Sequence, residues 1–167
     1  MREADVAIRM KEPSQADLIR KRLMNIKMQL FATPDYLAEH GTPQTMDDFS
    51  SHRLICQHAG TAQVAAGANL VADLMTHDIP STLTVNNYFG VLQGVVNHLG
   101  IGVLPDYLMD DFPNLVRVLP DVESGEVPVF LAYPEELRHS KRVGAFRDFV
   151  VEEIMAYRKR QQEDLTG

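Results

Sequence analysis

The segment at 85–108 constrains the fold more than any other part of this 167-residue chain. Its apolar residues recur at the spacing of one helix face: Tyr88, Val91, Leu92, Val95, Val96 and Leu99. A stripe of this width has to be buried against another element. Asn86 or Asn87 precedes it as a good N-cap, and Gly100 follows it as a residue that tolerates the left-handed end of a helix. With the apolar run Ile101–Leu104, the segment predicts a buried helix, a glycine turn and a buried strand.

Strands and helices alternate along the rest of the chain. Apolar patterns predict strands at 4–9, 28–33, 53–57, 115–119 and 127–133, and helices at 34–40, near 70–75 and after Ser140. The stretch 18–24 is a short mixed segment, and the polar tail at 158–167 is expected to fray. Short connections between alternating strands and helices favour an α/β fold.

Charge and cysteine content exclude several classes of protein. The formal net charge is −7, so the chain lacks the basic face that a direct reader of DNA needs. A single cysteine, Cys56, allows no intrachain disulfide and fits the reducing cytoplasm. No apolar run approaches the roughly 18 residues of a membrane span, and the first residues do not read as a signal peptide. We therefore expect a cytoplasmic protein without membrane contact.

The motifs of catalysis and metal binding are missing. The six histidines include no His-Glu-x-x-His pair, and neither a nucleophile elbow nor a phosphate loop occurs. Gly100-Ile101-Gly102 follows a helix instead of opening one, the wrong order for a dinucleotide fingerprint. The paired carboxylates at 47–48 and 110–111 are expected to be caps and solvated charges. The sequence thus predicts no enzyme, no metal and no cofactor.

Candidate binding residues lie where predicted strands meet helices or loops. In open α/β sheets, ligands bind at the carboxyl ends of strands, where helix N-termini favour anions. Five residues occupy such junctions: Arg9, Thr61, Asn86, Asn87 and Tyr88. Four of them have a plain structural alternative: capping for the two asparagines, a salt bridge for Arg9 and a simple loop role for Thr61.

Several stretches together resemble one protein family. They are 4–9 (ADVAIR), 32–37 (ATPDYL) with Gly41-Thr42-Pro43, 99–107 (LGIGVLPDY), 115–120, 129–134 (VFLAYP), and 140–143 (SKRV) with 146–149. In this order they resemble the C-terminal part of LysR-type transcriptional regulators.

The resemblance implies a sensor that binds a small-molecule effector, such as a carboxylate or an aromatic acid, in a two-lobed α/β domain like the type 2 periplasmic binding proteins. Residues 34–127 would form a complete second lobe. Residues 1–33 would form a partial first lobe with a crossover strand, and 128–167 the return strand and C-terminal helix of that lobe. The family's winged helix-turn-helix is missing, so DNA would be contacted only through that absent domain.

Two further expectations follow. An incomplete first lobe would expose a strand edge near Val6 and Ile8, and such an edge invites pairing with another chain, so we expect a homo-oligomer. A solute-binding protein of a transport system would use the same fold and is the main alternative. An enzyme on this scaffold would need converging acid, base and nucleophile groups, and no such set is visible.

Overall fold

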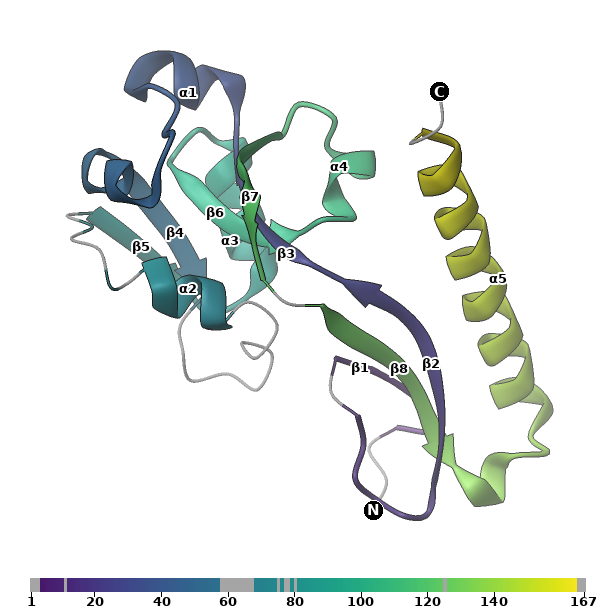
Figure 1. The fold of residues 1–167 in the computed structure, drawn as a ribbon. Helices are drawn as coiled ribbons and strands as arrows, with labels where there is room; N and C mark the ends of the chain where they lie inside the picture. The colour runs from purple at the N-terminus through teal and green to yellow at the C-terminus, as the bar shows by residue number, and fades with distance from the viewer. Residues whose placement is uncertain are drawn as a thin grey trace. The chain divides into compact units, whose positions relative to one another are not determined.

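The structure is a computed structural model that describes residues 4–10, 12–57, 68–74, 76, 79, 81–124 and 126–164. The chain divides into two compact units. Unit 1 combines Met1–Asn25 with Val127–Gly167, and unit 2 is Ile26–Glu126. Figure 1 shows the elements of both.

Unit 2 is built on a five-stranded mixed sheet in the order β5-β4-β6-β3-β7. The strands are β3 (Met28–Ala32), β4 (Arg53–Gln57), β5 (Ser81–Val85), β6 (Ile101–Pro105) and β7 (Val116–Glu123). β4 runs parallel to both β5 and β6, whereas β3 is antiparallel to β6 and β7. The three parallel strands therefore end at a common edge.

The helices of unit 2 are short. They are α1 (Pro34–His40), the 3₁₀ turn η1 (Met46–Ser51), α2 (Ala68–Leu74), α3 (Tyr88–Val96) and α4 (Leu108–Asp111). Val91 and Val95 of α3 are buried in one cluster with Phe31, Ile55 and Leu104 of the sheet. The predicted buried helix and buried strand are thus confirmed.

Gly102 permits the close packing of α3 on β6. A Cβ atom on Gly102 would lie 2.5 Å from Cγ2 of Val95 and 2.9 Å from Cγ1 of Val91. Real Cβ atoms do not approach other atoms that closely, so any larger residue would push the helix off the sheet.

The end of α3 differs from the prediction. The helix stops at Val96 with Asn97 as its C-cap, and His98, at φ 61°, takes the left-handed position expected for Gly100. Leu99, predicted to belong to the buried stripe, is 41% exposed. Gly100 is needed for another reason: a Cβ there would lie 2.4 Å from the carbonyl oxygen of Arg53.

Unit 1 carries a three-stranded sheet in the order β1-β8-β2 and one long helix. Its elements are β1 (Ala7–Arg9), β2 (Leu18–Ile26), β8 (Val127–Pro134), the 3₁₀ turn η3 (Glu135–Leu137) and α5 (Lys141–Asp164). β1 pairs antiparallel with β8, with Ile8 opposite Leu131.

Two predictions for unit 1 were wrong. The stretch 18–24 lies within strand β2, whose end is buried through Leu23 and Ile26 while its middle stays exposed. The tail does not fray at Arg158, because α5 continues to Asp164. That stretch holds no glycine or proline, and Arg, Lys, Gln and Glu are all good helix formers.

Candidate functional site

The carboxyl ends of the three parallel strands define the candidate site in unit 2. Gln57 at the end of β4 is in register with Val85 at the end of β5. Pro105 at the end of β6 is in register with Met28, where antiparallel β3 begins. The next residue, Asp106, donates its backbone N–H to the carbonyl of Lys27 at 2.9 Å. Ligands of open α/β sheets bind at such an edge.

Asn86 and Asn87 form a hydrogen-bonded corner between β5 and α3. Oδ1 of Asn87 accepts the Gly90 N–H at 2.8 Å, and its Nδ2 donates to Oδ1 of Asn86 at 2.7 Å. Nε2 of Gln57 donates to the backbone carbonyl of Asn86 at 3.2 Å. Asn87 is thus the N-cap of α3, as one of the two alternatives predicted. Its amide stays exposed beside the positive end of the helix dipole.

Tyr88 has two neighbours at this edge that sequence reasoning did not select. Tyr107 and Asp106 follow β6 as Tyr88 follows β5, and all three are partly buried. Burial raises the pKa of the Tyr88 phenol, and the nearby Tyr107 raises it further. Burial also raises the pKa of Asp106, against backbone hydrogen bonds and Arg117, which lower it. Asp106 and Tyr107 directly follow Pro105 at the end of a strand. The same criterion, a polar residue just after a strand, was used to choose Asn87 as a candidate.

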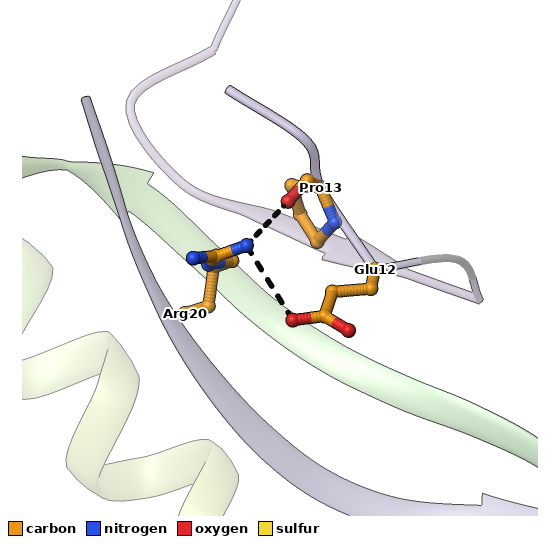
Figure 2. A network of polar contacts seen from close by, with 3 residues as sticks. All are labelled: Glu12, Pro13 and Arg20. Carbon is orange, nitrogen blue, oxygen red and sulfur yellow. Dashed lines mark hydrogen bonds and ion pairs between the residues drawn. The ribbon is translucent and has the colours of Figure 1, made fainter. Parts of the chain in front are cut away.

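Arg9 belongs to unit 1, where it lines a cavity of about 230 Å³ with Glu12, Ser14 and Leu18 among others. Glu12 already has a partner: Nη1 of Arg20 lies 3.4 Å from its Oε1 and donates to the carbonyl of Pro13 at 2.9 Å (Figure 2). The predicted alternative for Arg9 was a salt bridge, and among the described residues no carboxylate forms one with it. Its guanidinium is exposed and suited to a carboxylate.

The structure therefore brings together three of the five predicted residues, Asn86, Asn87 and Tyr88. Arg9 lies in the other unit, and Thr61 falls outside the described residues. Within the described ranges no group of three His, Cys, Asp or Glu side chains is placed to hold a metal ion. Among the helices in those ranges, none combines the length and apolar character that crossing a membrane requires.

A mixed α/β fold with polar residues at the ends of its parallel strands is the architecture of a ligand-binding domain. Residues 1–155 match the family described as "LysR substrate binding domain". The chain belongs to this family.

Relatives and solved structures agree with this assignment. The HTH-type transcriptional regulator CrgA of Neisseria meningitidis serogroup C is 27% identical over 157 residues, covering 92% of this chain and 52% of that protein. An uncharacterized HTH-type transcriptional regulator of Haemophilus influenzae is 25% identical over 138 residues, covering 81% of this chain and 48% of its own length. The regulatory domain of CrgA superposes with a TM-score of 0.74 at 24% identity, covering 91% of this chain and 76% of that one.

Family membership confirms two predictions. The fold is the α/β, type 2 periplasmic-binding-protein-like fold of LysR regulatory domains, and the function class is that of an effector-binding domain of LysR-type regulators, a family of regulators and not of enzymes. The chain spans about half the length of these relatives.

Proposed function

We propose that this domain senses a small carboxylate, with an aromatic acid as the favoured class, at the edge formed by Asn86, Asn87 and Tyr88. The observation that carries the proposal is the junction itself, where a capped nine-residue helix starts at the shared carboxyl end of three parallel strands. Backbone N–H groups and the helix dipole favour an anion there.

The neighbours of this junction suit an aromatic ligand. Tyr88 follows β5 and Tyr107 follows β6, and Tyr107 lies close enough to raise the pKa of the Tyr88 phenol. Phenol rings bind aromatic groups through their faces and edges, and each brings a polar hydroxyl. Because the pKa of Asp106 is raised, this carboxyl group takes up a proton at a higher pH than an ordinary aspartate does. As the pH falls, it therefore repels an incoming carboxylate less than an ordinary aspartate would.

Arg9 supplies a second anion-binding group in our proposal. Arg9 lines its cavity together with Glu12, and the carboxylate of Glu12 is already engaged by Arg20. A ligand carboxylate would form a bidentate pair with Arg9. Thr61 remains a proposed contact from the sequence alone.

The decisive experiment uses a substitution that keeps the helix cap. Asn87→Asp retains a good N-cap but places a negative charge where the ligand's carboxylate would bind. With benzoate and salicylate as probes, we expect calorimetry to show binding to the parent chain and a loss of about tenfold or more in Asn87→Asp, because like charges repel at short range.

The matched control is Asn97→Asp, at the opposite end of the same helix. Nδ2 of Asn97 donates to the carbonyl of Gln93, so this site also involves an asparagine in local capping. The proposal fails if both variants bind the probes like the parent chain, or if Asn97→Asp weakens binding as much as Asn87→Asp does.

The intact regulator is proposed to act as a homo-oligomer in the bacterial cytoplasm. β1 is an edge strand of its sheet, and Ile8 on it is 53% exposed. An apolar edge with unpaired backbone groups favours pairing with a second copy. This chain carries a net charge of −7, which disfavours direct contact with DNA phosphates. We therefore assign DNA contact to the half of the longer regulators that this chain does not cover.

A further inference from the structure

A cavity of about 510 Å³ lies in unit 2, away from the proposed effector edge. Its walls come from the start of α1, the end of α3 and the loop between α4 and β7. Ala32, at the end of β3, is in register with Val116, where β7 begins. Phe31 is in register with Gly102 near the start of β6. These registers place the cavity at the amino ends of the parallel strands, the edge opposite Asn87.

His98 forms a fixed part of this cavity's wall. Leu99 N–H donates to the Gly94 carbonyl and His98 N–H to that of Val95, so the left-handed backbone of His98 is held by two hydrogen bonds. A residue with a side chain is less stable in this left-handed conformation than in the right-handed one. A strained backbone conformation persists only where the surrounding contacts hold it in place, and such conformations are concentrated at binding sites.

The imidazole is positioned through both ring nitrogens. Nδ1 lies 2.7 Å from Oγ1 of Thr33, which is only 4% exposed, and Nε2 lies 3.5 Å from Oδ2 of Asp35. Thr33 Oγ1 also accepts the Tyr36 N–H as the N-cap of α1. The hydroxyl proton is then available to Nδ1, which leaves the Nε2–H directed at the Asp35 carboxylate. The ring thus lies beside Asp35 at the cavity wall.

The charge of the cavity is negative and its walls are largely apolar. Asp35 and Asp111 line it, whereas none of its described lining residues is a lysine or an arginine. Val96, Phe112 and Leu115 contribute apolar surface to the same lining. The volume falls within the range of about 300–1,000 Å³ that is usual for small-molecule sites. A ligand that fits this lining has one cationic group and a compact hydrocarbon body.

We propose that this cavity is a second small-molecule site of the domain, and that it binds a small organic amine. The protonated amine pairs with Asp35 and Asp111, and its hydrocarbon part contacts Phe112 and Leu115. The site is opposite in charge preference to the carboxylate site at Asn87. It does not depend on that proposal, because the two sites share no residue.

Phenethylamine and 3-phenylpropionate test this inference, since they share a phenylethyl body and differ in the sign of their charge. We expect phenethylamine to bind the full chain, with amide chemical-shift changes in NMR at His98, Leu115 and their neighbours. We expect 3-phenylpropionate to produce none there. Absence of phenethylamine binding up to millimolar concentrations, or shifts confined to Asn86–Tyr88, would overturn the inference.

The carboxylates are tested with the double variant Asp35→Asn/Asp111→Asn. Removal of two exposed ion pairs should weaken phenethylamine binding about threefold to tenfold. Asp121→Asn, on β7 outside the cavity, is the matched control for a lost negative charge and should leave the affinity unchanged. Circular dichroism verifies that each variant is folded. An unchanged affinity in the double variant, or an equal loss in Asp121→Asn, would show that the cavity carboxylates do not bind the amine.

Discussion

His52 shows at the residue scale how burial sets a protonation state. Its ring is buried, 5% of the residue being exposed, and Nδ1 lies 3.2 Å from the hydroxyl of Tyr36. That hydroxyl also accepts the Arg53 N–H at 3.0 Å, so its own proton is available to Nδ1 and the neutral imidazole accepts it. Burial lowers the pKa of His52, and the charge of nearby His40 lowers it further, while Asp48 acts in the opposite direction.

The lowered pKa predicts a pH dependence of stability. Below the unfolded-state pKa of about 6.5 the unfolded chain binds a proton at His52 that the folded chain binds more weakly. The free energy of unfolding should therefore fall as pH drops below about 6.5 and through the lowered pKa of folded His52. Urea unfolding between about pH 7.5 and pH 5 should show a smaller fall for His52→Gln than for the parent chain. Equal falls in both proteins would contradict this assignment.

At the scale of elements, glycines mark where backbone packing decides the fold. Gly102 lies under α3, where Val91 and Val95 occupy the space that a side chain would need. Gly144 lies near the start of α5, and the nearest atom to an added Cβ is Nη2 of Arg147 at 3.9 Å. The same substitution is therefore expected to have opposite consequences in strand β6 and in helix α5.

Gly102→Ala and Gly144→Ala form a matched pair. We expect Gly102→Ala to lower the free energy of unfolding by about 1–3 kcal/mol, because α3 must move away from β6. Gly144→Ala should raise it by about 0.5–1 kcal/mol, since alanine loses less backbone entropy in a helix. Chemical denaturation measures both, and a destabilised Gly144→Ala or a neutral Gly102→Ala would show that the packing of these helices is misassigned.

For the whole molecule, the two passages of the chain between the units are tied together. The backbone N–H of Met28 donates to Oγ of Ser124 at 2.8 Å, and the N–H of Ser124 donates to the Met28 carbonyl at 3.0 Å. Both passages lie at the edge that carries the proposed effector site, close to Asp106. The proposed effector site therefore lies beside the segments that lead into and out of unit 2.

The proposed oligomer is tested at the same scale. Ile8→Lys places a charge on the edge strand β1, and a lysine there disfavours strand pairing between copies. We expect light scattering to show an oligomer for the parent chain and a smaller species for Ile8→Lys. Leu83→Lys, on the edge strand β5 of the other sheet, is the control. A monomeric parent chain, or dissociation only in Leu83→Lys, would contradict pairing through β1.

Features that depend on near neighbours in the chain were determined by the sequence alone. Pro34 opens α1 after the Thr33 cap, and Gly41 ends it at φ 86°. Asn87 caps α3, and Asp48, one of the carboxylates expected to act as a cap, accepts the Thr45 N–H at 2.9 Å. Caps are satisfied within about four residues, so local spacing was sufficient to predict them.

Only the tertiary structure decided which distant residues share a surface. The left-handed residue at the end of α3 is His98 and not Gly100. Gly100 is needed for packing instead, because the Arg53 carbonyl leaves no room for a side chain there. The tertiary structure also placed Tyr107 beside the Asn87 corner and Asp35 beside His98. The parallel register of β4, β5 and β6 brings Tyr107 to the same edge of the sheet as the Asn87 corner. Strand register is fixed by burial and pairing between segments far apart in the chain, which local patterns do not record.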